Sequence, residues 1–390
     1  MNIASKSRSH IRVNPATDAN AEFRLHHWLG LGLALLALFG VGFYSANSQA
    51  EPYLAVRNNQ PCSACHVNPT GGGARNSYGS YYGSQILPAK AGDVSLFDGG
   101  ALTETLRLGA NLRTGFSNQN NDDAESSQGF ETQSGQLYFH ITPKGARFSL
   151  YIDEQVAPGA AINREAFVLM PLEGQHYLKT GRLFMPYGLR LEDDSAFVRQ
   201  MTQFNFDNSD NGVELGLYFG SLAIHSVISN GASTTTNDDN QLHYLTRWEY
   251  LGGTWRLGAN VSLNDAEAGQ RLTTGVYAGL NLWNYVLLAE WDSVVDESIQ
   301  TAQGHDQSQQ AGLIELNRLL QPGLNLKLTA EYLDPDTRVK NNLRSRHSAL
   351  LEYTPYANLQ LRGGLRVSDD IPQRPEGNND QVFMQLHVYY

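Results

Sequence analysis

Cysteine and methionine are scarce in this chain of 390 residues, which contains two of the first and five of the second. Both cysteines stand in one short run, Cys62-Ser63-Ala64-Cys65-His66. A zinc site would need a second ligand pair at close spacing, and there is none. A redox C-x-x-C pair would need a βαβ setting, which is also missing. These two interpretations of the run are therefore disfavoured.

Long hydrophobic runs are also missing. The longest, residues 28–43, has 16 residues, whereas a membrane-spanning helix needs about 20. It follows a basic stretch without a twin arginine and precedes Ser48-Gln49-Ala50, a small-x-small cleavage pattern. This order predicts a signal peptide over residues 1–50, with a retained N-terminal anchor as the alternative. No stretch after residue 50 could form a membrane helix.

Positive charge is in deficit, with a formal net charge of −11. Residues 1–50 hold four basic residues and two acidic ones, so their removal leaves a net charge of −13. Such a balance argues against nucleic acid as a partner. The chain also shows no Ser/His/Asp set, phosphate-binding loop or paired-carboxylate site. Classical hydrolytic and phosphoryl-transfer chemistry are thus not indicated.

The run from Cys62 to His66 has the C-x-x-C-H pattern of a c-type haem attachment site. In such a site two thiols form thioethers to the porphyrin, and the adjacent imidazole takes an axial position on the iron. The motif lies about a dozen residues after the predicted cleavage site. Export fits this interpretation, because bacterial c-type attachment occurs outside the inner membrane. We therefore expect one covalent haem c, held by Cys62, Cys65 and His66.

Residues 51–93 form a small segment around this motif, rich in glycine, asparagine and tyrosine. The segment has too few apolar residues to build much of a core. It contains no methionine and no histidine besides His66, so it lacks an ordinary second axial ligand. The haem must then borrow a ligand, use an unusual one such as Lys90, or stay five-coordinate. We expect the segment to pack against or inside the structure made by residues 94–390.

Residues 94–390 show the two-residue period of membrane β-strands, with apolar side chains towards lipid and polar ones towards a lumen. The period is clearest at the C-terminus, where Val382, Met384, Leu386, Val388 and Tyr390 alternate with mostly polar residues. A last strand of this kind resembles the assembly signal of bacterial outer-membrane proteins. The same period recurs in residues 102–112, 255–263, 272–282, 324–332 and 359–367. The prediction is an all-β, transmembrane antiparallel β-barrel.

Short turns and longer polar connections alternate along this part of the chain. Seven short turns lie at 142–145, 171–175, 219–221, 251–253, 283–284, 321–323 and 354–358. Eight longer loops lie at 117–128, 157–163, 185–211, 230–240, 264–270, 293–309, 334–345 and 368–380. Fifteen connections predict about 16 strands, with both barrel ends on the short-turn, periplasmic side. The haem segment would then lie at the periplasmic mouth or in the lumen.

The longer loops are acidic, which fits either a funnel for metal cations or an ordinary solvated surface. Their carboxylates are Asp122, Asp123, Glu125, Glu192, Asp193, Asp194, Asp207, Asp210, Asp238, Asp239, Asp292, Asp296, Glu297, Asp334, Asp336, Asp369 and Asp370. The longest loop, 185–211, has the aromatic and basic content of a constriction that folds into the pore. A packed extracellular hairpin is the alternative.

Alternation predicts four lumen-facing histidines: His140, His225, His243 and His387. We expect His140 and His387 near the periplasmic end, which makes them the candidate second axial ligands of the haem iron. Met185 and Met201 could reach the haem only if their loop folds deep into the pore. The alternative for each histidine is a polar lumen residue with its hydrogen bonds satisfied.

A signal peptide, one C-x-x-C-H motif, a short linker and a barrel of about sixteen strands resemble the fused outer-membrane monohaem cytochrome–porins of iron-oxidising bacteria. The resemblance implies haem attachment by Cys62 and Cys65, axial ligation by His66, and an electron conduit across the outer membrane. The partners it implies are a periplasmic c-type cytochrome and an extracellular donor or acceptor, with Fe(II) as one candidate. The run Pro69-Thr70-Gly71-Gly72-Gly73 departs from the sequence of the iron oxidases.

The expected function is therefore outer-membrane electron transfer through one covalent haem, with Fe(II) oxidation as one form of it. The cofactor would supply the chemistry, and no side chain need act as acid, base or nucleophile. Two other functions remain open. The barrel could be a diffusion porin with the haem as plug or redox gate, which lumen arginines such as Arg107, Arg113 and Arg362 support. It could also be a haem-based sensor.

Overall fold

The computed structural model describes residues 51–92, 100–121, 125–205, 208–232, 236–237, 239–301, 304–369 and 378–390, all in one compact unit. The predicted signal peptide, residues 1–50, lies outside the described residues. So do five of the acidic loop residues, namely Asp122, Asp123, Asp207, Asp238 and Asp370. No helix in the described ranges is long and apolar enough to cross a membrane.

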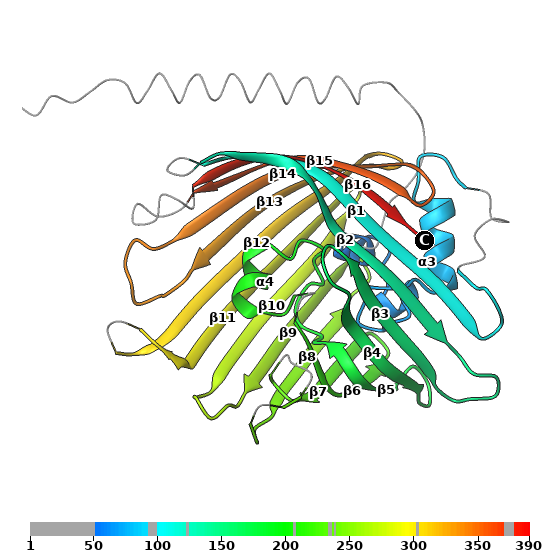
Figure 1. Cartoon of the computed structure of the whole chain (residues 1–390), viewed down its shortest axis with the longest axis horizontal. Helices are drawn as coiled ribbons and strands as arrows, with labels where there is room; N and C mark the ends of the chain where they lie inside the picture. Colours follow the sequence, from blue (N-terminus) through cyan, green and yellow to red (C-terminus); the bar gives the residue numbers. More distant parts are fainter. Residues whose placement is uncertain are drawn as a thin grey trace, which may run out of the picture. The chain divides into compact units, whose positions relative to one another are not determined.

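Sixteen antiparallel strands form a closed barrel, in which each strand pairs with its sequence neighbours and β1 pairs with β16 (Figure 1). The strands are β1 (Leu106–Asn121), β2 (Ser127–Ile141), β3 (Ser149–Ala157), β4 (Ile162–Pro171), β5 (Tyr177–Phe184), β6 (Ser209–Phe219), β7 (Leu222–Ser229), β8 (His243–Leu251), β9 (Trp255–Asn264), β10 (Arg271–Leu282), β11 (Tyr285–Gln300), β12 (Asp306–Gln321), β13 (Leu324–Asp334), β14 (Arg344–Tyr356), β15 (Leu359–Asp369) and β16 (Asn379–Tyr389). The prediction of a sixteen-stranded antiparallel barrel is confirmed.

The barrel closes through its last residues, because Tyr390 and Ala110 exchange two backbone hydrogen bonds of 2.8 and 3.1 Å. Closure leaves no unpaired strand edge, which is the condition for a stable barrel. The side chains alternate as predicted in the final strand. Met384 and Val388 are 49 % and 43 % exposed on the outer surface, whereas His387 and Tyr389 are 2 % and 3 % exposed inside.

Several connections differ from their predicted lengths. The predicted loop 117–128 is mostly strand, since β1 ends at Asn121 and β2 begins at Ser127. The predicted loop 293–309 is also mostly strand, because β11 runs to Gln300 and β12 starts at Asp306. At the other end, β1 begins at Leu106, so Leu102 precedes the strand. Polar composition alone predicts loop at these positions, but paired backbone continues each hairpin beyond the apolar band.

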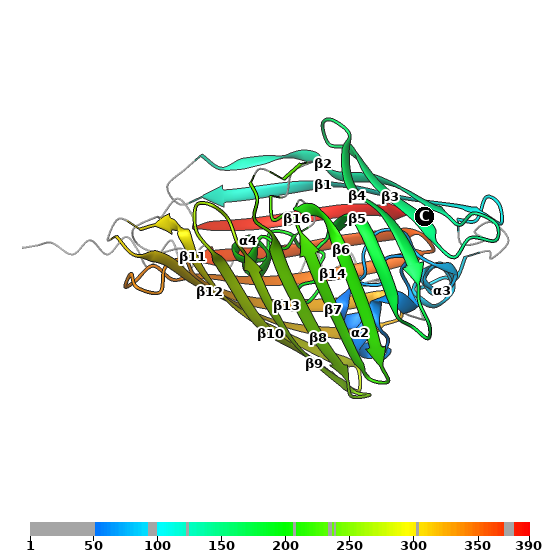
Figure 2. The same cartoon turned by 90° about the horizontal axis from the view of Figure 1, so that it is seen from below.

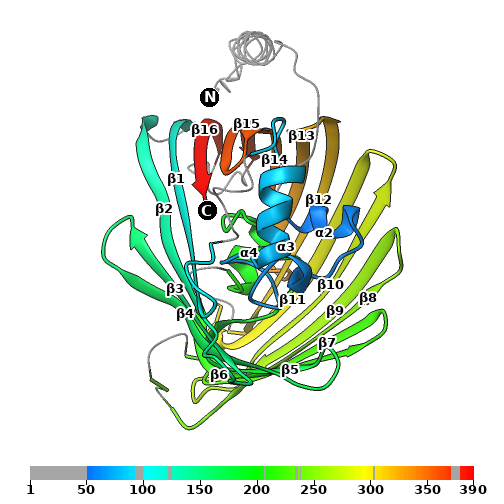
Figure 3. The same ribbon diagram turned by 90° about the vertical axis from the view of Figure 1, so that its right-hand side faces the viewer.

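The lumen holds two pieces of chain (Figures 2 and 3). One is the segment 51–92, with α2 (Pro52–Arg57), η1 (Cys62–Ala64), α3 (Ser77–Tyr81) and η2 (Tyr82–Ile86). The other is the long β5–β6 connection, with α4 (Phe197–Thr202). Figure 1 shows α4 between the walls of the barrel and α3 at its mouth, beside the C-terminus. Both predictions are confirmed: the segment 51–92 packs against and inside the barrel, and the longest loop folds into the pore.

Both pieces pack on an apolar part of the inner wall. Tyr53, Leu54 and Val56 from α2, and Phe197, Val198 and Met201 from α4, share one buried cluster. On the wall this cluster includes Val286, Leu288, Val294, Ala311 and Leu313. The inner face of β11 and β12 is therefore covered by the two inserted pieces, which pack on its apolar side chains.

Candidate functional site

The Cys62–His66 run forms a tight turn that closes on itself. The backbone N–H groups of Cys65 and His66 both donate to the Cys62 carbonyl, at 3.2 and 3.1 Å. The Asn76 side chain donates to the carbonyls of Ser63 and Ala64 at 3.0 and 3.1 Å. The same side chain caps α3 by accepting from Gly79 N at 2.9 Å. One asparagine therefore ties the cysteine turn to the helix beside it.

The glycine run after the motif is explained by close packing. Gly71, Gly72 and Gly73 have φ of 93°, 81° and 63°, a region that side chains other than glycine rarely adopt. A Cβ on Gly71 would lie 3.3 Å from Cys62 Sγ, and one on Gly73 would clash with the Tyr151 hydroxyl. That hydroxyl accepts from Ala74 N at 3.0 Å. The run thus lets backbone lie directly against the cysteine sulfur and the barrel wall.

Asn68 fixes the segment to the opposite wall. Its side-chain nitrogen donates to both carboxylate oxygens of Glu165, at 3.0 and 3.1 Å. Its oxygen accepts from Lys179 Nζ at 3.3 Å and from Thr70 Oγ1 at 3.0 Å. The residue is fully buried. This amide therefore holds the segment on β4 and β5 through Glu165 and Lys179, and it also fixes the backbone of the segment through Thr70.

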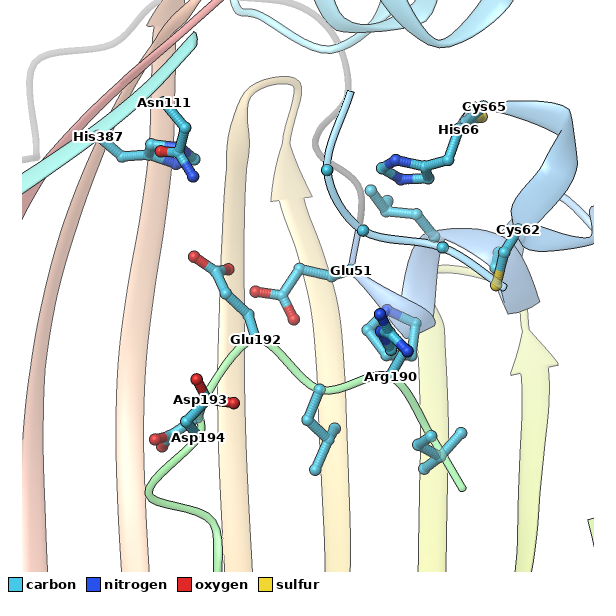
Figure 4. A pocket seen from close by; sticks show the side chains of 18 of the residues that line it. Glu51, Cys62, Cys65, His66, Asn111, Arg190, Glu192, Asp193, Asp194 and His387 are labelled. Carbon is cyan, nitrogen blue, oxygen red and sulfur yellow. The ribbon is translucent and has the colours of Figure 1, made fainter. Parts of the chain in front are cut away.

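A cavity of about 710 Å³ opens beside the motif, within the size range of sites for cofactor-sized molecules. Cys62, Cys65 and His66 line it, and so does His387 from β16. Figure 4 shows His66 and His387 on opposite sides of this space. The Nδ1 atom of His66 and the Nε2 atom of His387 are buried without a hydrogen-bond partner. Each of these two nitrogens is therefore available to a ligand or an ion placed in the cavity.

The electrostatic surroundings suit metal ligation better than thiol redox chemistry. Burial, with smaller effects of Arg75 and Arg190, lowers the pKa of His66 to about 4, so the imidazole is neutral. A neutral imidazole is the form that binds a metal. Burial also raises the pKa of the Cys65 thiol. A reactive redox cysteine needs the opposite shift, because the thiolate is its reactive form.

Acidic and basic side chains that line the cavity join the two inserted pieces to each other and to the wall (Figure 4). Glu51 pairs with Lys327 at 2.8 Å, and Glu192 pairs with Arg113 at 2.6 Å and Arg362 at 2.9 Å. Burial raises the pKa of Glu51 well above its usual value. Burial would also raise the pKa of Glu192, but Arg113 and Arg362 lower it well below that value. This network, which we call the lumen latch, connects the start of the segment, the long loop and the wall.

The other candidate ligands lie elsewhere. His225 contacts the Tyr177 hydroxyl at 2.9 Å, and His243 lies between Ser229 and Ser262 at 3.0 and 2.7 Å. These two are satisfied polar residues, as the alternative interpretation held. The lining of the cavity does not include His140, Lys90, Met185 or Met201. Of the two candidate second axial ligands, the geometry therefore favours His387 over His140.

Several of the carboxylates predicted to form either an acidic funnel or a solvated surface are instead paired with residues of the wall. Asp292 lies within β11, is fully buried and accepts from the Tyr187 hydroxyl at 2.8 Å. Asp296 pairs with Arg271 at 2.6 Å, and Asp193 pairs with Arg366. These residues hold strands and the long loop together. Sequence reasoning missed the roles of Glu51 and Arg190 because neither stands in a recognisable motif.

No protein-family model and no curated protein matches the chain. Solved structures do match. The anion-selective porin of Comamonas acidovorans has a TM-score of 0.56 and 11% identity, and the match covers 73% of this chain and 99% of that chain. The barrel has the fold of a porin. OmpT of Vibrio cholerae matches with a TM-score of 0.57 and 9% identity, over 73% of this chain and 99% of that chain. OmpF of Salmonella typhi, in complex with daunomycin, matches with a TM-score of 0.56 and 12% identity, over 73% of this chain and 97% of that chain.

The comparison therefore establishes the barrel architecture and gives no information on the chemistry of the site. At such low identity the likeness concerns the fold alone.

Proposed function

We propose that this chain is an outer-membrane electron-transfer protein with one covalently bound haem c. The observation that carries the proposal is the position of Cys62, Cys65 and His66 on a cofactor-sized cavity inside a porin-type barrel. An apolar outer surface over a polar interior supports location in an outer membrane. A predicted signal peptide over residues 1–50 supports export.

The residues present fit the haem. Cys62 and Cys65 would hold its porphyrin by thioethers, and neutral His66 would bind the iron, with His387 the candidate second axial ligand. Arg75 and Arg190 line the cavity and would supply positive charge for the carboxylates of the porphyrin. When bound, the haem would supply the one-electron chemistry between an extracellular donor or acceptor and a periplasmic cytochrome.

The rest of the chain shields and positions the site. The segment 51–92 and the long loop fill much of the lumen and are joined by the lumen latch. Burying a cofactor there would exclude water and keep soluble metal ions on the outer side. An electron could then cross while an insoluble oxidised product stayed outside, which is why Fe(II) remains a candidate donor.

The test begins with attachment. The chain is expressed with a c-type maturation system, and haem is stained on a denaturing gel. The native chain and an Ala64→Ser control should retain covalent haem, and a Cys62→Ser/Cys65→Ser variant should lose it. A native chain without covalent haem would refute the proposal.

The second test is stopped-flow visible spectroscopy of the oxidised protein in detergent after addition of Fe(II). Rapid appearance of reduced c-type bands would support Fe(II) as donor. A haem that is reduced by dithionite but not by Fe(II) would exclude Fe(II) and direct the search to another donor.

One observation also favours a gated or plugged porin as a second candidate function. The inserted pieces are held by salt bridges rather than by a continuous apolar core alone, so they could be displaced. A conductance that depends on the haem oxidation state would identify this function; a pore that stays closed in both states would exclude it.

A further inference from the structure

The lumen latch carries more negative than positive charge. Its salt bridges connect four carboxylates with three cations: Glu51, Glu192, Glu315 and Glu352, with Arg113, Lys327 and Arg362. Two neighbouring pairs, Asp193 with Arg366 and Glu331 with Arg346, are each balanced. Four negative charges against three positive ones leave the latch with one excess negative charge, among the residues that the structure describes.

This excess charge is buried. The side chains of Glu51 and Glu352 are each 2 % exposed, and that of Glu315 is 5 % exposed. Tyr53 and Asn325 donate hydrogen bonds to Glu352 at 3.3 and 3.1 Å, which satisfies oxygen atoms without adding positive charge. A buried charge without a counter-charge is strongly unfavourable. We therefore expect one more positive charge in the latch.

Glu51 lies where this charge is needed. Its carboxylate is 2.8 Å from Lys327 Nζ and 3.4 Å from a guanidinium nitrogen of Arg362. The carboxyl group of Glu192 lies within hydrogen-bonding reach of it, and Figure 4 shows the two side by side. The main-chain nitrogen of Glu51 belongs to the same residue, so it lies within a few ångströms of the Glu51 carboxylate. A positive charge on that nitrogen would therefore act directly on the latch.

We propose that the α-ammonium group of Glu51, created when residues 1–50 are removed, is the missing cation of the lumen latch. The predicted cleavage pattern ends at Ala50, outside the described residues. Water, acting in a signal peptidase, hydrolyses the peptide bond between Ala50 and Glu51. Its hydroxyl group goes to the Ala50 carbonyl, which becomes a carboxylate, and the Glu51 nitrogen takes up protons.

The charge of the new amine follows from its surroundings. An α-amine with an ordinary pKa of about 8 is mostly protonated at neutral pH, and adjacent carboxylates favour that form. The latch then holds four cations for its four carboxylates, with the α-ammonium as the fourth. Removal of the signal peptide and closing of the lumen are thereby linked. This inference goes beyond the proposed function, because it needs no haem.

The first test locates the amine. The full chain is exported, purified in detergent and acetylated with an amine-reactive reagent at a pH of about 7, and its first peptide is identified by mass spectrometry. The peptide should begin at Glu51, and its amine should react at least about tenfold more slowly in the folded chain than in the unfolded chain, because it is buried and paired. Lys144, 88 % exposed, is the reference and should react alike in both. Another first residue, or an α-amine that reacts alike in both states, would overturn the inference.

The second test moves the amine and leaves every side chain of the latch in place. Insertion of Asn-Gln between Ala50 and Glu51 keeps the cleavage pattern before the insert, and it shifts the α-ammonium by up to about 7 Å. Mass spectrometry confirms the new first residue. Limited proteolysis of the loop 185–211 at neutral pH should become about tenfold faster, because the latch regains its excess negative charge and opens more often. An unchanged rate would overturn the inference and would indicate that a proton shared by Glu51 and Glu192 balances the latch instead.

A double-mutant cycle shows whether the amine acts through the latch. In a Glu192→Gln background one negative charge is already gone, so the insertion should accelerate proteolysis less than about twofold. Glu104→Gln is the matched control at a side chain that is 87 % exposed, and there the insertion should keep its full effect. Equal acceleration in the native and Glu192→Gln backgrounds would overturn the inference. None of these measurements needs the haem, so a chain without covalent haem would refute the proposed function and leave this inference standing.

Discussion

At the residue scale, His387 and His140 are the two candidates for the second axial ligand of the proposed haem. His387 lies on the cavity with a buried, unpartnered Nε2, and its Nδ1 contacts Gln360 Oε1 at 3.2 Å. A ring nitrogen oriented by a second hydrogen bond is the usual arrangement of a metal-binding histidine. His140 is predicted to face the same lumen but does not line the cavity.

We therefore expect His387→Ala to change the ferric haem from low spin to high spin. His140→Ala, the matched control, should leave the spin state unchanged. Electron paramagnetic resonance and the visible spectrum report the result. Low-spin spectra in both variants would show that neither histidine is the second ligand.

Asp193 provides a pH prediction. Burial would raise its pKa, but Arg366 and Arg346, together with hydrogen bonds from Ser195, lower it from 3.8 to about 2. A lowered folded-state pKa stabilises the folded loop above the unfolded pKa, and this contribution is lost as the pH falls from about 4 to about 2. Because the side chain is 40 % exposed, solvent screening limits the effect to about 1 kcal/mol.

Asp193→Asn should therefore loosen the long loop at neutral pH. Limited proteolysis should cut the loop of the variant a few-fold faster than that of the native chain at pH of about 7. With an acid-stable protease at pH of about 2, where the carboxylate is about half protonated in the folded loop, the difference should shrink. A difference that persists unchanged in acid would contradict the prediction.

At the element scale, α3 acts as the support of the cysteine turn. Gly79 faces the Cys65 carbonyl with no room for a side-chain atom, whereas Gly83, one turn later, has neighbours no closer than 3.8 Å to the position of an added Cβ. The two glycines form a matched pair that differs in the space around them.

Gly79→Ala should displace α3 from the motif, at a cost of about 1–3 kcal/mol, as expected for overpacking. Gly83→Ala should be close to neutral. Haem content per barrel and the rate of proteolysis within 51–92 measure the effect. Equal behaviour of the two variants would show that α3 does not support the turn.

Much of this architecture follows from the sequence, for a physical reason. In strands such as β9, β15 and β16, mostly apolar lipid-facing residues alternate with mostly polar lumen-facing ones. The two-residue period of these strands can therefore be recognised in the sequence. In β11 the run Val286-Leu287-Leu288 is apolar on both faces, because its inner face is covered by inserted chain. That run could have indicated that a piece of chain packs against the inner face of β11. The salt bridges of Glu51 and Glu192 could not be predicted from the sequence, because their basic partners are distant along the chain.

At the scale of the whole molecule, the barrel is filled from both directions. The segment 51–92 occupies one mouth and the long loop occupies the middle, and Glu51, Glu192 and their basic partners join the two. Arg346 adds a second attachment for the loop, donating to the Ser195 carbonyl at 2.7 Å while paired with Glu331 at 2.5 Å. Diffusive flow through such a barrel should be small.

Native protein in planar bilayers should thus conduct far less than an unplugged porin. Arg346→Gln combined with Arg366→Gln removes two of the attachments of the loop, and it should increase conductance several-fold or produce flicker. Arg338→Gln, at an exposed position in the connection between β13 and β14, is the control and should conduct like the native chain. A large, steady native conductance would mean that the inserted pieces do not obstruct the pore.

The enclosed position of the cysteine turn has a consequence for the order of biogenesis. The turn lies inside a closed ring of strands, with the Gly71–Gly73 backbone against one sulfur and α3 against the carbonyl of Cys65. A ligation enzyme is itself a folded protein and cannot enter that ring. Haem would therefore have to be attached to the nascent, unassembled chain in the periplasm. Each barrel would then be committed to its cofactor before it reached the membrane, with no later opportunity for loading or exchange.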